Sequence, residues 1–319
     1  MDISVVIPVY GCKTALPELH RRLTETLIGM KKEYEILLVD DHCPQNSWES
    51  IREICESDKR VVGIRMSRNF GQIRAITAGV EHATGNWIVV MDCDLQDRPE
   101  TIPALYEKAM EGFDAVFVKR AERKDSFLTK LLSRTFYKVY SYFTGGAYDS
   151  SLCNFSISRR VVMENYCRMR EQNRSFVMFV RWLGFSQTSI TAVEDPRFAG
   201  KSSYSFRKKM KMATEIITSQ SNKPLLFSIR LGFIASLLAL IYILYLVFRS
   251  VMVGDALIGW TSVIASIYLI GGLLLVAIGV VGLYIGNIFE EVKRRPLYVV
   301  SEVLNPTKKE KTIATTKEE

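Results

Sequence analysis

Two long runs without a charged residue limit most strongly what this chain can fold into. They cover Leu231–Phe248 and Ala256–Phe289. A bilayer needs roughly 20 apolar residues per helix, so each run can supply one membrane-spanning helix, and the second can also include part of a loop. The alternative is a core helix of a soluble protein, but the length of both runs argues against it. We therefore predict a transmembrane hairpin.

Basic residues lie outside this predicted hairpin rather than within it. Lys223 and Arg230 flank the first run, and three basic residues at 293–295 follow the second. Only Arg249 and Asp255 lie between the runs. Because cytoplasmic flanks carry an excess of Lys and Arg, we expect a multi-pass protein of the cytoplasmic (inner) membrane. Both termini and the N-terminal domain should lie on the cytoplasmic side.

Net charge and cysteine spacing limit the partners and metal sites to be expected. The chain has 319 residues and a net charge of +8, which could indicate a nucleic-acid partner. Its basic residues instead gather near the apolar segments, so we expect no nucleic acid. The six cysteines show neither a Cys-x-x-Cys pair nor zinc-type spacing. They are predicted to be reduced and mostly buried thiols of a cytosol-facing protein.

The first third of the chain alternates predicted strands and helices. The apolar runs predict strands at Ser4–Val9, Tyr34–Val39, Val61–Met66, Trp87–Met91 and Ala115–Val118. Helical periodicity predicts helices at Leu16–Met30, Ser47–Ser57, Ile73–Ala83 and Thr101–Glu111. This alternation indicates an α/β fold with a doubly wound, mostly parallel sheet. The sequence has neither a GxGxxG nor a GxxxxGK[ST] motif, so no dinucleotide or P-loop site is expected.

Polar residues follow successive strand ends and predict one shared crevice. They are Tyr10, Asp40-Asp41, Ser67-Arg68-Asn69, and the pair Asp92 and Asp94. In open α/β sheets ligands bind outside the carboxyl ends of the strands. Two carboxylates there suit Mg²⁺ or Mn²⁺, which would hold a substrate diphosphate. A bare Asp-x-Asp is more often a pair of solvated turn acids, but the other strand ends favour a metal site.

Two basic segments are candidates for contact with lipid headgroups. Lys119–Tyr142 is amphipathic and includes Arg120, Arg123 and Lys124, and Ser205–Met212 has the same character. A solvated helix face is the alternative explanation. The neighbouring apolar runs favour a surface that lies on anionic lipid.

These motifs together resemble family-2 glycosyltransferases of the GT-A fold. More narrowly, the chain is similar to membrane-bound polyprenyl-phosphate (bactoprenol) glycosyltransferases, relatives of dolichyl-phosphate mannose synthase. The resemblance runs from residue 3 to about residue 300 and depends on the order and spacing of several short motifs. They are Ser4–Tyr10, Leu38–Asp41, Ser67–Gln72, Met91–Asp97 with Pro99-Glu100, Pro196–Ser202, and Glu290–Tyr298 after the hairpin.

The resemblance implies a nucleotide-sugar donor, an acceptor lipid phosphate and a divalent metal. Asp92 and Asp94 would hold Mg²⁺ or Mn²⁺, and Asp94, Asp97 and Arg197 would be the catalytic residues. The donor would contact Pro8, Val9, Tyr10, Asp41, Asn69, Gln72, Asp92 and Gln96. Phosphate and acceptor contacts are expected from Arg120, Arg123, Lys124, Arg197, Lys201 and Ser202. Relatives also suggest a homo-oligomer through the membrane helices.

Three positions depart from the family's pattern. Gly11-Cys12 stands where the family has Asn-Glu, and His42-Cys43 where it has Gly-Ser. The segment in which many relatives place a catalytic Asp has Cys153 or Asn154 there, with Asp149 as a fallback. A sugar hydroxyl must lose a proton as it attacks, whereas a lipid phosphate is largely dianionic at neutral pH. The departure therefore favours a phosphate acceptor.

The expected organisation has four parts. Residues 1–204 form a cytosolic GT-A domain, 205–224 a basic juxtamembrane helix, 225–289 two transmembrane helices and 290–319 a cytosolic tail, of which Lys308–Glu319 is expected to be disordered. The expected reaction is inverting transfer of one sugar from a UDP-linked donor to polyprenyl (undecaprenyl) phosphate, for cell-envelope glycan assembly or modification. Two alternatives are a processive polysaccharide synthase and a non-catalytic membrane scaffold derived from a transferase. Arg181-Trp182 matches the second half of the Gln-x-x-Arg-Trp signature of such synthases, but Met178 stands in place of the Gln.

Overall fold

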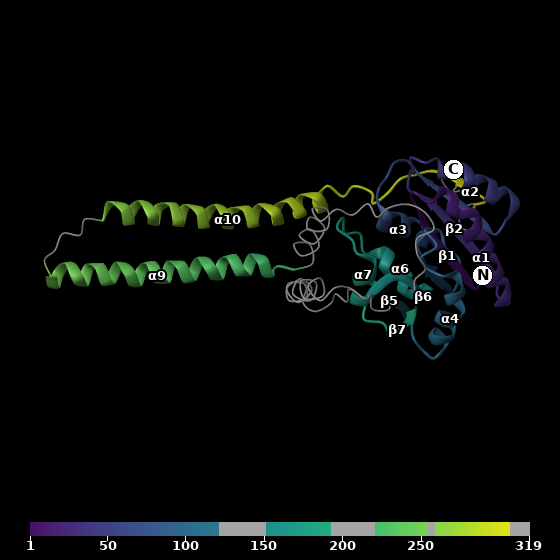
Figure 1. The fold of residues 1–319 in the computed structure, drawn as a ribbon, viewed down its shortest axis with the longest axis horizontal. Helices are drawn as coiled ribbons and strands as arrows, with labels where there is room; N and C mark the ends of the chain where they lie inside the picture. Colours follow the sequence, from purple (N-terminus) through teal and green to yellow (C-terminus); the bar gives the residue numbers. More distant parts are fainter. Residues whose placement is uncertain (121–150, 193–220, 254–258, 307–319) are drawn as a thin grey trace, which may run out of the picture. The chain divides into compact units, whose positions relative to one another are not determined.

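A computed structural model of the protein describes residues 1–120, 151–192, 221–253 and 259–306 (Figure 1). The chain divides into two compact units. The first comprises Met1–Thr135, Ala147–Tyr204 and Pro296–Glu319, and the second Phe136–Gly146 and Ser205–Arg295.

The first unit is built on a mixed sheet of eight strands among the described residues. The order is β7-β5-β6-β4-β1-β2-β3-β8. Strands β4, β1, β2 and β3 are parallel, and so are β5 and β7, whereas β6 and β8 run antiparallel to their neighbours. The strands span Ile3–Val9 (β1), Tyr34–Asp40 (β2), Val61–Met66 (β3), Trp87–Val90 (β4), Ala115–Arg120 (β5), Leu152–Arg159 (β6), Gln187–Ala192 (β7) and Val300–Leu304 (β8).

The central strands are buried on both faces. Every residue of β1, β2 and β4 is buried, as expected for parallel strands covered by helices. This explains why each of them appears in the sequence as an unbroken apolar run. The predicted α/β fold with a mostly parallel sheet is confirmed.

Helices cover both faces of the sheet (Figure 1). On one face α1 (Leu16–Gly29), α2 (Ser47–Ser57) and α4 (Ile102–Met110) pack against the odd-numbered side chains of β1. On the other face α3 (Gln72–His82), α6 (Arg160–Arg168) and α7 (Phe176–Trp182) pack around Val6. Helix α3 comes so close to β1 that a Cβ on Gly79 would lie 2.4 Å from Val6 Cγ1. Only glycine fits at this position.

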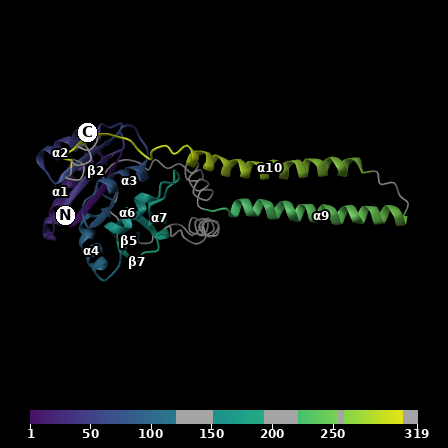
Figure 2. The ribbon, with the colours of Figure 1, turned by 180° about the vertical axis from the view of Figure 1, so that it is seen from behind.

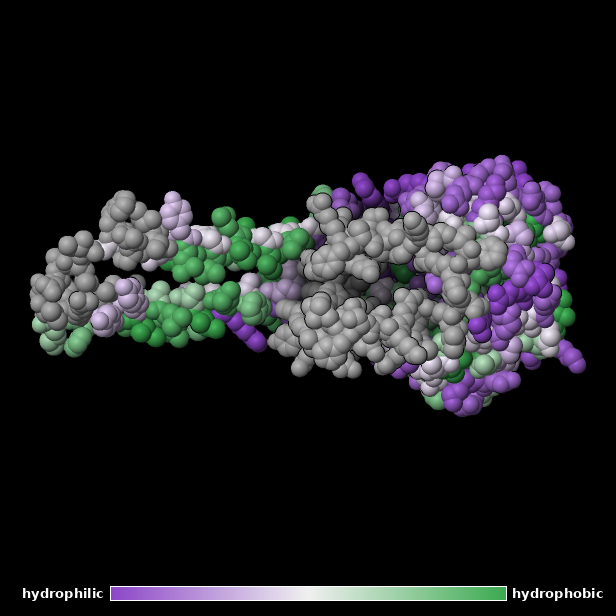
Figure 3. Space-filling view, viewed as in Figure 1, coloured by the Kyte–Doolittle hydropathy of each residue, from purple (hydrophilic) through white to green (hydrophobic). Residues whose placement is uncertain are grey.

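The second unit contains two long helices that lie side by side in both views (Figures 1 and 2). They are α9 (Lys223–Val253) and α10 (Trp260–Val292). Both are long and apolar enough to cross a membrane, in the windows Lys223–Tyr242 and Ser266–Val292. Neither window is buried within the described residues, and apolar side chains predominate on the coloured parts of both helices (Figure 3). Such an exposed apolar surface suits a lipid environment.

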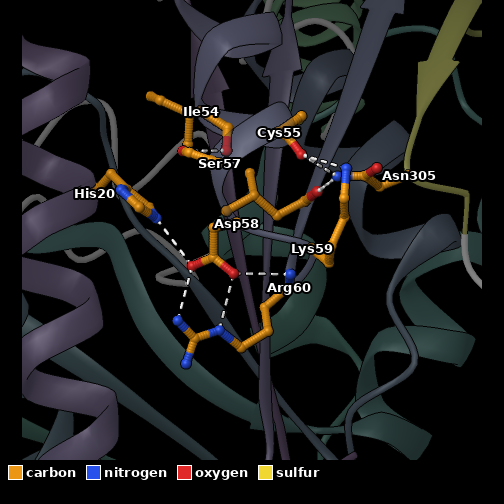
Figure 4. Close-up of polar contacts among 9 residues, drawn as sticks. His20, Ile54, Cys55, Ser57, Asp58, Lys59, Arg60 and Asn305 are labelled. Carbon is orange, nitrogen blue, oxygen red and sulfur yellow. Dashed lines mark hydrogen bonds and ion pairs between the residues drawn. The ribbon is translucent and has the colours of Figure 1, made fainter.

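After α10 the chain returns to the first unit as β8, a strand that the sequence analysis did not predict. It pairs antiparallel with β3 at the edge of the sheet. The expectation for 290–319 was a tail, and the structure places part of it in the sheet. Trp48 Nε1 in α2 donates a hydrogen bond to Glu302 Oε2 at 3.1 Å. Asn305 Nδ2 donates to the carbonyls of Cys55 (2.7 Å) and Val61 (2.9 Å) (Figure 4).

The same corner holds a compact polar cluster around Asp58 (Figure 4). Its carboxylate accepts hydrogen bonds from Arg60 Nε and Nη2, both at 2.9 Å, and lies 3.1 Å from His20 Nε2. Burial disfavours the charged carboxylate, but the bonds from Arg60 and His20 outweigh it and lower the pKa of Asp58 to about 2. The cluster ties α1 to the turn between α2 and β3.

Candidate active site

Most of the predicted site residues that the structure describes follow the carboxyl ends of β1, β2 and β4, while Asn69 and Gln72 follow β3. These strands are parallel neighbours, so the residues that follow them come to one edge of the sheet. Pro8 and Val9 are buried within β1, whereas Tyr10, the next residue, is 51% exposed. A nucleoside base could therefore contact the side chain of Tyr10 but only the backbone of Pro8 and Val9.

The segment after β4 alternates between exposed and buried side chains. Asp92, Asp94 and Gln96 are partly exposed, while Cys93, Leu95 and Asp97 are buried. Leu95 adopts a left-handed conformation with φ 62°, and the backbone N–H of Gln96 donates to Asp94 Oδ1 at 3.2 Å. Both carboxylates are thus partly accessible at the end of β4, and their shared metal site stays a prediction.

Two neighbours fix the position of Asp92. Gln72 Nε2, at the start of α3, donates to Asp92 Oδ1 at 2.6 Å. Asp97 is only 6% exposed, and its Oδ2 accepts the backbone N–H of Asp92 at 3.1 Å. Gln72 was predicted as a donor contact and Asp97 as a catalytic residue. The structure places both beside the acidic pair, and their roles toward a sugar stay predictions.

Asp41 lies at the end of β2 and holds the following loop in place. It is 2% exposed, and its two oxygens accept the backbone N–H groups of Phe70 (2.7 Å) and Gly71 (2.9 Å). Burial raises the pKa of Asp41, and these hydrogen bonds oppose the rise. The bonds position the loop that carries Asn69 and leads into Gln72. The predicted contact between Asp41 and the base stays a prediction.

The cysteine prediction is wrong for two of the six thiols, because Cys12 and Cys93 form a disulfide. They are 81 residues apart in the sequence, so local spacing carried no signal. Since β1 and β4 are neighbours, however, the residues that follow their ends meet in space. That pairing of strands is the clue that could have revealed the bond. Cys43, Cys55, Cys153 and Cys167 take part in no disulfide among the described residues.

Strand β6 brings the position of the missing acid to the same edge. It runs antiparallel to β4 with Val90 opposite Ser156, so Cys153 and Asn154 lie beyond the end of β4. Cys153 Sγ donates to the carbonyl of Val118 at 3.1 Å. Arg120 ends β5, but its side chain is not described. Arg123, Lys124, Asp149, Arg197, Lys201 and Ser202 lie outside the described residues, as do Ser205–Met212 and Lys308–Glu319.

The side chains present fit a hard divalent cation bound mainly through its substrate. Among the residues that the structure describes, no group of three or more His, Cys, Asp or Glu side chains is arranged to hold a metal ion. Mg²⁺ commonly takes one or two protein carboxylates and fills its other positions with water and phosphate oxygens. Two partly exposed carboxylates, Asp92 and Asp94, match that requirement.

Comparisons with known proteins agree with this geometry. Residues 4–166 match the family model described as glycosyl transferase family 2. The glycosyltransferase YkcC of Bacillus subtilis is 37% identical over 303 residues, covering 95% of this chain and 94% of that protein. A prophage bactoprenol glucosyl transferase homolog of Escherichia coli is 33% identical over 304 residues, covering 95% of this chain and 99% of that protein.

A solved structure of glucosyl-3-phosphoglycerate synthase from Mycobacterium tuberculosis, in complex with Mn²⁺, UDP-glucose and glycerol 3-phosphate, is similar at 16% identity. Its TM-score is 0.48, and the match covers 68% of this chain and 78% of that one. The family model covers the strands β1 to β4 and the acidic pair, and the curated relatives extend the match through both apolar helices. The mixed sheet with helices on both faces is the GT-A-like fold that the sequence motifs implied. This chain belongs to glycosyl transferase family 2.

Proposed function

We propose that this protein transfers one sugar, with inversion, from a UDP-linked donor to polyprenyl (undecaprenyl) phosphate at the cytoplasmic face of the membrane. The product would serve cell-envelope glycan assembly or modification. The observation that carries the proposal is the acidic pair Asp92 and Asp94, which is partly exposed beyond the strand next to the one that Tyr10 follows, in a chain with two apolar helices. The near full-length similarity to a protein named as a bactoprenol glucosyl transferase homolog supports the lipid acceptor.

On the donor side, the chain's own residues orient the nucleotide. Tyr10 offers an exposed ring to the base, and the loop held by Asp41 borders the same edge. Gln72 and Asp97 keep Asp92 in position, so little reorganisation is needed when the donor arrives. A divalent cation at Asp92 and Asp94 would offset the charge that grows on the departing nucleoside diphosphate.

On the acceptor side, a lipid phosphate needs no general base. Its second pKa lies near ~6, so it is largely dianionic at neutral pH. Cys153 and Asn154 supply no carboxylate at the edge of the site, and the Cys153 thiol is already engaged with a carbonyl. A hydroxyl acceptor would lose the ~10²–10⁴-fold that a positioned base contributes. This difference supports phosphate over alcohol as the attacking group.

The test is a transfer assay with the purified full-length protein in detergent. Undecaprenyl phosphate and undecaprenol are compared as acceptors in the presence of Mg²⁺ or Mn²⁺ and a panel of nucleotide sugars. We expect transfer to the phosphate only, with a rate that falls as the pH drops through about 6. Asp149→Asn should change turnover by less than ~10-fold, because no proton has to be removed.

Three results would contradict the proposal, each at a different point. Transfer to undecaprenol at a comparable rate would show that a base exists and that the acceptor class is wrong. An Asp149→Asn variant as inactive as a metal-site variant would locate that base at Asp149. Absence of transfer from every nucleotide sugar, together with absence of UDP binding, would favour the non-catalytic scaffold instead.

A further inference from the structure

Cys12 and Cys93 connect the two sides of the candidate donor site. Cys12 follows Tyr10 by two residues, and Cys93 lies between Asp92 and Asp94. The structure joins them by a disulfide with their Cα atoms 6.1 Å apart. Disulfides usually span Cα separations of about 4.4–6.8 Å, and this pair lies within that range. The bond therefore crosslinks the loop after β1 to the acidic segment after β4.

The disulfide lies behind the acidic pair and not in front of it. Cys93 is 5% exposed and belongs to the apolar cluster beneath the sheet edge, against which Cys12 packs. Asp92 and Asp94, on either side of Cys93, are more exposed. Because the side chains alternate in this way, the bond can form without filling the space that a donor diphosphate would take.

Both sulfurs also have suitable neighbours when the bond is open. The Cys12 thiol lies 3.6 Å from the carbonyl of Tyr10, which can accept its hydrogen. Cys93 would remain among apolar side chains, where a reduced thiol packs as a small hydrophobic group. Reduction would thus leave the fold in place and remove only the link between the two sides of the site.

We propose that Cys12 and Cys93 are a reversible thiol–disulfide modification site that sets the affinity for the nucleoside diphosphate part of the donor. The inference rests on the proposed function, since it takes the donor to lie between Tyr10 and the acidic pair. A cytosol keeps most thiols reduced, and the disulfides that do form there are usually catalytic or redox-sensing. A bond in this place fits a regulatory role better than a purely structural one.

The oxidant would be a low-molecular-weight disulfide such as oxidised glutathione. Cys12, the more accessible of the two, attacks one sulfur of that disulfide and releases one thiol, leaving a mixed disulfide on Cys12. The sulfur of Cys93 then attacks the Cys12 sulfur, loses its proton to solvent and releases the second thiol. Two protein thiols become one disulfide, and one small disulfide becomes two thiols.

Oxidation should strengthen nucleotide binding. With the bond closed, Tyr10 and the acidic pair are held at a fixed separation, so a ligand that touches both has less chain freedom to restrict. With the bond open, the loop after β1 moves independently of the acidic segment. We expect UDP to bind at least about threefold more tightly to the oxidised protein, because the disulfide removes part of the entropy cost of ordering the loop on binding.

The experiment uses the full-length protein in detergent, equilibrated in glutathione buffers from fully reducing to oxidising. UDP affinity is measured by calorimetry with Mg²⁺, and the state of each cysteine by alkylation and peptide mass spectrometry. Cys12→Ser and Cys93→Ala should each show one affinity in all buffers, equal to that of the reduced protein. Cys167→Ser, which alters another partly buried thiol away from this pair, should keep the full redox response.

The outcomes separate the inference from the proposed function. If Cys12 and Cys93 are both thiols in every buffer, the disulfide does not form in solution and the inference is refuted. A Cys12–Cys93 bond that forms without changing UDP affinity would refute the control of the donor site while leaving the proposed transfer intact. Absence of UDP binding in all buffers would refute the donor and with it the redox effect. If Cys93→Ala does not fold, Cys12→Ser alone decides, since Cys12 is less buried.

Discussion

Asp92 and Asp94 are both partly exposed after β4, where they alternate with the buried Cys93 and Leu95. The sequence predicted acids at a strand end here, because an unbroken apolar run ends in Asp-x-Asp. The sequence could not predict the partners of Asp92. Gln72 and Asp97 reach it through the tertiary arrangement of α3 and the turn after Leu95.

The acidic pair makes a first prediction about metal dependence. Asp94→Ala should lower turnover by at least ~10²-fold, the scale for losing an electrostatic stabiliser of the transition state. Excess EDTA should abolish transfer in the unmodified protein, and added Mg²⁺ or Mn²⁺ should restore it. Steady-state rates with saturating lipid phosphate measure both effects. Glu25→Ala, which removes an exposed acid on α1, is the control and should retain full activity. Undiminished transfer in EDTA would contradict the predicted metal.

Asp58 gives a second prediction, about the stability of the folded protein at low pH. The pKa of Asp58 is lowered from 3.8 to about 2 in the folded protein, so its ionised form is favoured by folding. The contribution to the free energy of unfolding is therefore complete above about pH 4 and disappears as the pH falls toward 2. Asp58→Asn should be less stable at neutral pH and lose less further stability between pH 4 and pH 2. Unfolding of both proteins in detergent across this range checks it, and parallel curves would refute the assignment to Asp58.

At the scale of elements, the sequence predicted the strands and helices from β1 to β5 within about two residues. It succeeded there because strands buried on both faces are continuous apolar runs and the covering helices have clear periodicity. It did not predict β6, β7 or β8. Most residues of β7 and β8 are only partly buried, and their sequences mix polar and apolar residues without a clear run. Such edge strands are defined by their neighbours more than by their own composition.

The attachment of β8 gives a third prediction. Asn305 donates to two carbonyls on different sides of the turn before β3. Asn305→Ala leaves both without that partner and should lower the free energy of unfolding of the first unit by about 1–3 kcal/mol. It should also speed hydrogen exchange at the amides that pair β3 with β8. Asn165→Ala removes a local, exposed bond within α6 and serves as the control, with an expected loss below about 0.5 kcal/mol. Equal losses in the two variants would show that the Asn305 hydrogen bonds add no stability here.

The path of the chain through the sheet and the two apolar helices limits how the protein can be placed in a membrane. The chain leaves the first unit before α9 and re-enters it after α10, because β8 pairs with β3 in the same sheet. A polar sheet domain cannot lie on both sides of a bilayer. If α9 and α10 both span, then the segments before the first and after the second must be on the same side. The charge pattern is a separate observation, and it predicts that this side is the cytoplasm.

The last prediction tests this arrangement in intact cells. A cysteine-bearing tag after Glu319 should resist a membrane-impermeant thiol reagent until the membrane is permeabilised. The same tag inserted between the two helices, after Asp255, should react without permeabilisation. A third protein with the tag at Met1 should behave like the first, since the N-terminus lies in the sheet unit. If the tags at both ends react in intact cells, the orientation inferred from Lys and Arg is reversed while the hairpin stands. If only one end reacts, the two helices do not both span the membrane. That result would contradict the pairing of β8 with β3, which keeps both ends of the chain on one side.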